Sequence, residues 1–151
     1  ANNPSGIQKI IELKNRDMNK GFILLASDID YLLPYIDSNM SKDLLNQISL
    51  PSKTPTTFLV PKSEELSPLL AGDNELLAVR ITSNSLIKFF CEKTDSALIS
   101  TSANLNGKKV ATTKRELKHY FGNQLDYALP PSRYNSEPSR IINLLTGERI
   151  R

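Results

Sequence analysis

The residues best suited to hold a ligand are the uncharged run Ser100–Asn104, which directly follows the apolar segment Ala97–Ile99. Its hydroxyls, its amide and its backbone N–H groups can converge on phosphate or ribose oxygens. Serine, threonine and asparagine also dominate ordinary turns. The segment therefore predicts either a polar ligand site or a structural turn, and the rest of the chain must decide between them.

Three cations lie near the predicted end of the first helix, namely Lys14, Arg16 and Lys20. Cations at a helix C-terminus stabilise the helix dipole by about 0.3–1 kcal/mol each. A second explanation is that a strand edge presents them to a triphosphate, for which an arginine fork and lysine point charges are suited. The two explanations are compatible.

A further cation, Arg80, ends the apolar run Leu76–Val79 and is expected at or near one end of a sheet. Burying its charge without a partner would be costly. The partner is either one of the 16 acidic residues, in an internal salt bridge, or a bound anion.

Several common sites are absent from the sequence. It has no P-loop and no G-x-G-x-x-G motif, and no Cys/His spacing typical of zinc. The single histidine, His119, is expected on a helix surface rather than as a catalytic base, and no Ser-His-Asp set is compelling. Any metal is therefore expected as Mg²⁺ on a nucleotide.

Length and composition predict one soluble domain. The chain has 151 residues, 39% of them hydrophobic, with no apolar run long enough to span a bilayer and no signal-peptide pattern. Its one cysteine, Cys91, is expected to be a buried hydrophobe, so we expect a cytoplasmic protein. The net charge of +3 suits a polyanionic ligand.

Hydrophobic periodicity predicts alternating helices and strands. Helices are expected from Pro4-Ser5, from Ser41 to Ile48, from a cap at Ser83 or Asn84, and from a Thr113/Glu116 capping box to Phe121, with a shorter helical stretch at 31–34. Strands are expected at 22–26, 56–60, 76–81, 97–99 and 140–144. This alternation predicts an α/β domain with helices covering a mostly buried sheet.

Taken in order, several short elements resemble the YrdC-like threonylcarbamoyl-AMP synthases across about the whole chain. The elements are Lys14-x-Arg16, Lys20-Gly21, Pro55-x-Thr57-Phe58, Ala78-Val79-Arg80-Ile81, Ser100-Thr101-Ser102-Ala103-Asn104-x-x-Gly107, Pro138-Ser139, and Thr146-Gly147 with Arg151. The S-T-S-A-N-x-x-G element is the most diagnostic. The resemblance implies one domain over residues 1–151, with a twisted mixed sheet flanked by helices around a concave cleft.

The resemblance also implies an activity. Family members use ATP with Mg²⁺, bicarbonate and L-threonine to form threonylcarbamoyl-adenylate and pyrophosphate. The adenylate supplies the N6-threonylcarbamoyl group of adenosine 37 in tRNA, so tRNA and other proteins of that modification pathway are expected partners. This chemistry requires positioning and charge neutralisation rather than a protein nucleophile.

Site residues follow from the same resemblance, motif by motif. The implied catalytic residues are Lys14 and Arg16. The implied ATP-binding residues are Arg16, Lys20, Ser102, Asn104, Ser139 and Arg151. The implied threonine-binding residues are Thr57, Arg80 and Ser100. No resident metal is implied.

The chain departs from the family pattern on the threonine side. Family members usually carry an N-terminal strand-loop with Pro-Thr-Glu and Tyr-Gly-Leu, and this sequence starts just downstream of it, so an N-terminally incomplete domain with weakened turnover is expected. Other departures are Asp17, Lys53-Thr54, Thr82, Asn84-Ser85 and Asn106. The alternatives to the enzyme are a double-stranded RNA- or tRNA-binding module without catalysis, and an inactive remnant.

Overall fold

The structure is a computed structural model that describes residues 1–129 and 138–151. The α-helices are α1 (Pro4–Lys14), α2 (Lys42–Ser49), α3 (Pro68–Ala71), α4 (Ser85–Thr94) and α5 (Lys114–Phe121). Two 3-10 turns follow the first strand, η1 (Ile29–Tyr31) and η2 (Leu33–Tyr35). The strands are β1 (Ile23–Ala26), β2 (Thr56–Pro61), β3 (Leu76–Ile81), β4 (Leu98–Ser100) and β5 (Arg140–Asn143).

All five strands form one mixed sheet in the order β4-β1-β3-β2-β5. The pairs β1/β3 and β2/β5 are parallel. The pairs β1/β4 and β2/β3 are antiparallel. The mixed α/β architecture expected from the sequence is therefore confirmed.

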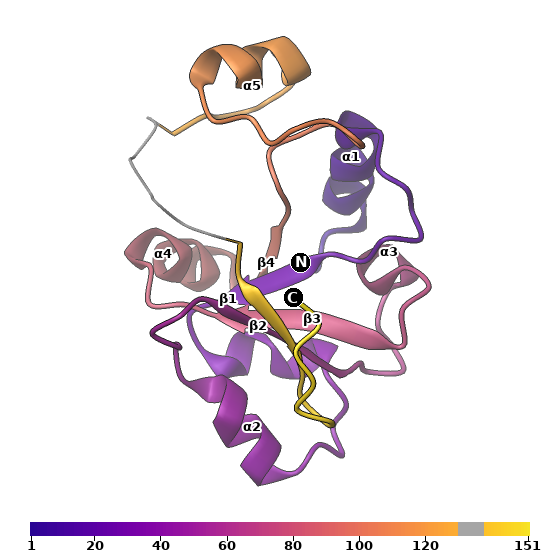
Figure 1. The fold of residues 1–151 in the computed structure, drawn as a ribbon, viewed down its shortest axis with the longest axis vertical. Helices are drawn as coiled ribbons and strands as arrows, with labels where there is room; N and C mark the ends of the chain where they lie inside the picture. Colours follow the sequence, from indigo (N-terminus) through magenta and orange to yellow (C-terminus); the bar gives the residue numbers. More distant parts are fainter. Residues whose placement is uncertain (130–137) are drawn as a thin grey trace.

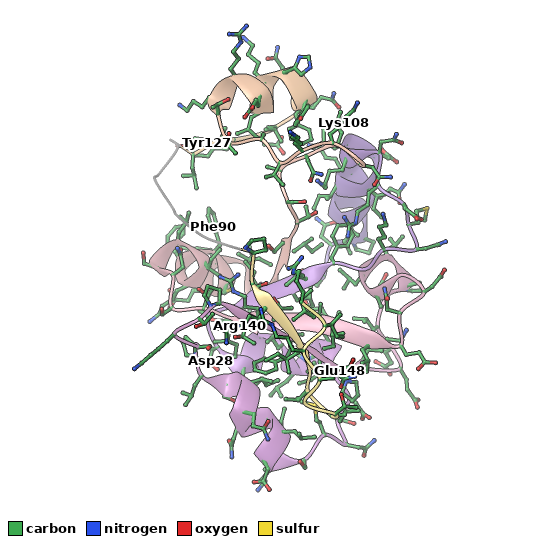
Figure 2. The ribbon with its side chains drawn as sticks, in the orientation of Figure 1. Asp28, Phe90, Lys108, Tyr127, Arg140 and Glu148 are labelled. Carbon is green, nitrogen blue, oxygen red and sulfur yellow. The ribbon has the colours of Figure 1, made fainter. Side chains whose placement is uncertain are left out.

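The two faces of the sheet differ in burial. Along β3, Leu77, Val79 and Ile81 are buried, and the residues between them are only partly buried. Because side chains alternate between faces of a strand, β3 has a core face and an open face. Figure 2 shows side chains filling the space between the sheet and α2, and the core there includes Leu32, Ile36, Ile48 and Leu70. The open face is where a ligand can reach the sheet.

The helices surround the sheet unevenly. Figure 1 shows α2 below the sheet, α1 and α3 beside one end of it and α4 beside the other. The helix α5 stands apart from the sheet and is reached through extended segments. None of the helices in the described ranges combines the length and the apolar character needed to cross a bilayer.

Most predicted helix starts are confirmed. Ser41 and Asn84 cap α2 and α4, and the capping box of Thr113 and Glu116 starts α5. The predicted start of α1 at Pro4-Ser5 is also confirmed, and its N-cap is Asn3, whose side chain accepts the Gly6 N–H.

Other details of the element predictions also change. The predicted helical stretch at 31–34 is divided between two 3-10 turns, with Leu32 between them, and α3 was not predicted. The fourth strand begins one residue later than expected, at Leu98. Cys91 is fully buried and His119 is exposed on α5, as expected.

Candidate functional site

The helix α1 ends in a left-handed turn immediately after Lys14. Asn15 adopts φ 48° and ψ 46°, a conformation that asparagine tolerates better than most residues. The backbone N–H of Arg16 donates to the Ile11 carbonyl at 2.9 Å and closes this turn. The sequence Lys14-Asn15-Arg16 thus places two cations at the end of a helix, on either side of a sharp change of chain direction.

Lys14, at the end of α1, is hydrogen-bonded to the loop that follows β4. Lys14 is only 5% exposed, and its Nζ donates hydrogen bonds to the carbonyl oxygens of Ser102 and Asn104. Its own carbonyl accepts the Asn106 N–H at 3.0 Å. Burial lowers the pKa of the Lys14 ammonium, and the positive charge of Arg16 lowers it further.

The loop is also bonded to itself. The Ser102 hydroxyl donates to Oδ1 of Asn104, and Nδ2 of Asn104 donates to the Lys108 carbonyl at 2.8 Å. The Ala111 N–H donates to the Ala103 carbonyl at 2.8 Å. The predicted polar loop therefore has a defined shape, in which the asparagine amide makes a structural bond across the loop.

The guanidinium of Arg16 is fixed against the start of β1. Its Nη2 donates to the Gly21 carbonyl at 2.7 Å and its Nε to the Lys20 carbonyl at 3.3 Å. The guanidinium carbon lies 4.7 Å from the centroid of the Phe22 ring, a cation–π distance. Burial lowers the pKa of Arg16, and the nearby Asp17 carboxylate opposes that effect. Arginine remains charged at physiological pH, so the result is an oriented cation.

These elements enclose a cavity of about 400 Å³, which we call the basic cavity. It is lined by Lys14, Arg16, Lys20, Ser102, Asn104, Asn106, Gly107 and Lys108. Four of the eight lining residues are cations and none is acidic. Such a lining attracts a polyanion, and a triphosphate or pyrophosphate has the charge and the acceptor oxygens to match it.

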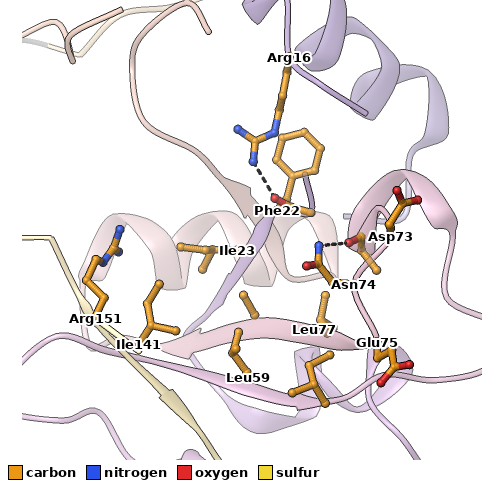
Figure 3. A pocket seen from close by; sticks show the side chains of 14 residues that line it. Arg16, Phe22, Ile23, Leu59, Asp73, Asn74, Glu75, Leu77, Ile141 and Arg151 are labelled. Atoms are coloured by element: carbon orange, nitrogen blue, oxygen red, sulfur yellow. Dashed lines mark hydrogen bonds between the residues drawn. The ribbon is translucent and has the colours of Figure 1, made fainter. Parts of the chain in front are cut away.

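A second cavity of about 740 Å³, which we call the sheet cavity, lies on the open face of the sheet. Its apolar floor includes Ile23, Leu59 and Ile141 (Figure 3). Arg16 and Arg151 lie at its edge, and the acidic residues Asp73 and Glu75 lie on another side. Because Arg16 lines both cavities, the basic cavity and the sheet cavity are neighbours.

Comparison with known proteins places this arrangement in a family. Residues 1–151 match the Sua5/YciO/YrdC family, which carries the description "Telomere recombination". The threonylcarbamoyl-AMP synthase of Acinetobacter baumannii is 36% identical over 99% of this chain and 82% of that protein. The threonylcarbamoyl-AMP synthase of Nitrosococcus oceani is 38% identical over 97% of this chain and 80% of that protein. The chain belongs to the Sua5/YciO/YrdC family.

Solved structures agree with the fold of this Sua5/YciO/YrdC domain. P. abyssi Sua5 complexed with L-threonine superposes with a TM-score of 0.81 at 18% identity, over 97% of this chain and 43% of the Sua5 chain. E. coli YciO gives a TM-score of 0.71 at 19% identity, over 99% of this chain and 75% of that chain. At these identities the likeness concerns the fold alone, and the present chain spans less than half the length of that Sua5.

Most of the residues predicted to bind the nucleotide lie around one cavity of this family member. All five line the basic cavity, namely Lys14, Arg16, Lys20, Ser102 and Asn104. The cations at the end of α1 and the polar residues after β4 are more than 80 residues apart in the sequence. The antiparallel pairing of β4 with β1 explains this, because it brings the end of β4 to the start of β1, where Ser100 pairs with Ile23. The predicted grouping of these five residues is therefore reproduced, whereas their contacts with ATP stay a prediction.

The other two predicted ATP-binding residues lie elsewhere. Arg151 lines the sheet cavity, and its Nε and Nη2 donate to the Ser139 carbonyl at 3.2 and 3.1 Å. Ser139 is buried, and its hydroxyl lies 2.8 Å from that of Thr57. Ser139 thus has both its carbonyl and its hydroxyl bonded to protein groups.

The predicted threonine-side residues share the open face of the sheet. Ser100 pairs with Ile23 and Arg80 pairs with Leu25, two positions further along β1. Thr57 is two positions from Leu59, which pairs with Ala78 on β3. The period of two puts Thr57, Arg80 and Ser100 on one face, but none of them lines either cavity.

The alternatives for Arg80 can now be compared. Its residue is only partly buried, and no ion pair joins it to an acidic residue in the described ranges. A salt bridge with a described residue therefore does not account for its charge. The position on the open face leaves the guanidinium accessible to an anion, and that anion stays a prediction.

Sequence reasoning missed two lining residues of the basic cavity, Asn106 and Lys108. Asn106 is the second x of the S-T-S-A-N-x-x-G element and Lys108 follows its last residue, Gly107. Including the x positions and one further residue would have found both. Asp73 and Glu75 of the sheet cavity precede β3 and had no comparable motif to mark them.

Proposed function

We propose that this chain forms L-threonylcarbamoyl-AMP and pyrophosphate from L-threonine, bicarbonate and MgATP. The product would supply the N6-threonylcarbamoyl group of adenosine 37 in tRNA, in the cytoplasm, with tRNA and other proteins of that modification as later partners. The observation that carries the proposal is the basic cavity, in which Lys14, Arg16 and Lys20 from the end of α1 meet Ser102 and Asn104 from the loop after β4. The threonylcarbamoyl-AMP synthases at 36–38% identity support the same assignment.

The reaction proposed here has two bond-forming steps. The threonine amine attacks the carbon of bicarbonate, and loss of water leaves a carbamate. A carbamate oxygen then bonds to the α-phosphorus of ATP, while the bond to the bridging oxygen of the β-phosphate breaks and pyrophosphate leaves with the electron pair. Negative charge accumulates on the departing pyrophosphate, so cations that are already oriented lower the barrier.

The basic cavity supplies such cations. Arg16 is held by two backbone carbonyls and by Phe22, so little reorganisation is needed when charge develops on a phosphate. In this proposal the polyphosphate lies in the basic cavity, and the rest of the adenylate extends past Arg16 into the apolar sheet cavity. Arg80 on the open face then provides the cation for the threonine carboxylate, with Thr57 and Ser100 on the same face.

The test is substrate-dependent pyrophosphate release by the purified chain. Release is expected only when ATP, L-threonine and bicarbonate are all present, and mass spectrometry should detect threonylcarbamoyl-AMP in the same mixture. Release that ignores threonine and bicarbonate, or no release at saturating substrates, would contradict the proposal. The second result would match the inactive remnant considered from the sequence.

A specific charge distribution favours a second candidate function, binding of structured RNA. Residues 108–119 hold five cations and one carboxylate, a net charge of +4, against +3 for the entire chain. The cations are Lys108, Lys109, Lys114, Arg115 and Lys118, and all five are exposed. The remainder of the chain therefore sums to −1.

These cations lie on one side of α5 and the segment before it. Lys114, Arg115 and Lys118 are all exposed, whereas Leu117 and Tyr120 are half-buried and Phe121 at the end of the helix is buried. Lys108 belongs to the segment that joins β4 to α5, and Figure 2 shows it near α1. Surfaces rich in lysine and arginine are more typical of nucleic-acid interfaces than of protein interfaces.

Salt dependence separates this candidate from the enzyme. Binding of double-stranded RNA through these five cations should weaken steeply between about 50 and 200 mM salt, by about two to three orders of magnitude if all five contact phosphates. Changing Lys114 and Lys118 together to Glu should abolish RNA binding and leave pyrophosphate release intact. Equal RNA binding by the double variant would remove α5 from the interface.

A further inference from the structure

Lys14 differs from the other cations of the basic cavity in what its side chain contacts. Lys20 and Lys108 are exposed, and Arg16 bonds to carbonyls close to it in sequence. Lys14 is buried and reaches 88 and 90 residues along the chain to the carbonyls of Ser102 and Asn104. Its partners all belong to the loop that forms the opposite wall of the cavity.

The bonds of Lys14 account for two of its three N–H donors. No carboxylate pairs with this ammonium in the described ranges. A buried ammonium held by neutral carbonyls, with three further cations around the same cavity, is stabilised when an anion enters. The third donor can serve that anion while the two carbonyl bonds persist.

We propose that Lys14 is a positioning residue that couples polyphosphate binding in the basic cavity to order in the loop Ser100–Gly107. The inference rests on the proposed function, because that function places the polyphosphate in this cavity. The two carbonyl bonds hold the Lys14 ammonium at the cavity wall, so an anion on the third N–H binds the ordered loop better than the open one and thereby stabilises it. The loop that carries Ser102 and Asn104 is then most ordered when the nucleotide is bound.

The loop offers amides that report this order. The Asn106 N–H donates to the Lys14 carbonyl at 3.0 Å, and the Asn104 N–H donates to the Ser102 carbonyl at 2.9 Å. Hydrogen exchange at these two amides measures how often the loop opens. Inorganic pyrophosphate is the probe, because it carries the charge without the nucleoside and needs no catalysis.

The experiment compares the wild-type chain with Lys14→Met and Lys20→Met, with and without saturating pyrophosphate. Lys14→Met should raise exchange at the Asn104 and Asn106 amides at least tenfold without ligand, and pyrophosphate should no longer slow it. Lys20→Met is the matched control, because it removes a cation from the same cavity without touching the loop. It should bind pyrophosphate more weakly, leave the ligand-free exchange unchanged and keep the slowing at saturation.

Several outcomes overturn the inference. They are unchanged loop exchange in Lys14→Met, equal loosening in Lys20→Met, or faster loop exchange when pyrophosphate binds the wild type. If Lys14→Met does not fold, the wild type alone decides, because pyrophosphate must slow exchange at both amides. A chain that shows this coupling but makes no threonylcarbamoyl-AMP retains the inference and loses the proposed function.

Discussion

The hydroxyl oxygens of Thr57 and Ser139 lie 2.8 Å apart, and both residues are buried. This contact joins β2 to the residue that precedes β5. The Ser139 carbonyl also accepts two hydrogen bonds from the Arg151 guanidinium. The family resemblance assigns Thr57 to threonine and Ser139 to ATP. The structure instead bonds these two residues to each other, so a change at one is expected to affect the other.

Replacing Thr57 with valine should destabilise the fold. The change keeps the shape but removes a hydroxyl, which leaves the buried Ser139 hydroxyl without this partner at a cost of about 1–3 kcal/mol. Thermal unfolding of Thr57→Val, Ser139→Ala and the double variant tests this, and the double variant should lose less than the sum of the two single losses. Unchanged stability together with weaker threonine binding would instead assign the Thr57 hydroxyl to the ligand.

Removing Arg16 should weaken nucleotide binding more than removing Lys20. The Arg16 guanidinium is oriented by the Gly21 carbonyl, whereas Lys20 is exposed. Losing a charge-assisted hydrogen bond costs about 1.5–3 kcal/mol, so Arg16→Ala should weaken ATP binding roughly ten- to hundredfold in calorimetric titration.

The control for the Arg16 titration is Lys53→Ala, an exposed cation that lines neither cavity. It should bind ATP as the wild type does. If Arg16→Ala also retains its affinity, Arg16 has only the structural role of stabilising the end of α1 and the start of β1.

Sequence patterns predicted the fold well where local chemistry decides the structure. The β3 strand follows from its apolar run, and α5 follows from a capping box that needs only residues 113–116. The two 3-10 turns were predicted as one short helical stretch and α3 was missed, because segments of three or four residues barely cover one helical period.

The site was predicted in part, for a related reason. Motif order brought Arg16 and Ser102 to one site, and the pairing of β4 with β1 makes them neighbours. The sequence could not show that the Lys14 ammonium bonds to carbonyls of that loop, because backbone acceptors carry no residue identity. The Thr57–Ser139 contact was hidden for the same kind of reason, since it depends on how β2 and β5 pair.

Replacing Asn104 with alanine should weaken nucleotide binding through the shape of the loop. The sequence predicted an exposed amide free for the ligand, but its Nδ2 bonds to the Lys108 carbonyl and its Oδ1 accepts from Ser102. Both bonds are lost in Asn104→Ala, while Asn104→Asp keeps the acceptor, loses the donor and adds a negative charge to the wall of the basic cavity.

Calorimetry with ATP should therefore rank the affinities as wild type, then Asn104→Ala, then Asn104→Asp, whose carboxylate repels the polyphosphate. Thermal unfolding should change little, because these bonds lie in a partly exposed loop away from the core. A large fall in unfolding temperature with unchanged ATP affinity would make Asn104 a purely structural turn residue.

The start of α5 should become less stable in acid because of Glu116. Its Oε2 accepts the N–H groups of Thr112 at 2.7 Å and Thr113 at 3.0 Å, and both threonine hydroxyls at 3.1 Å. These bonds, led by the Thr112 backbone, lower the pKa of Glu116 in the folded chain. A lowered pKa means that the stabilisation is present above the unfolded pKa of about 4.3 and is lost as the pH falls through the folded value.

Glu116→Gln keeps an acceptor at the capping position but removes the charge. At pH 7 the variant should show several-fold faster amide exchange in α5 than the wild type, and the difference should shrink as the pH falls through the lowered pKa of Glu116, where the wild-type carboxylate becomes protonated. Glu64→Gln, an exposed change outside α5, should leave this exchange ratio at one throughout. A difference between Glu116→Gln and wild type that stays constant from pH 7 to pH 3 would show that the charge of Glu116 contributes nothing and that only the shape of the capping box matters.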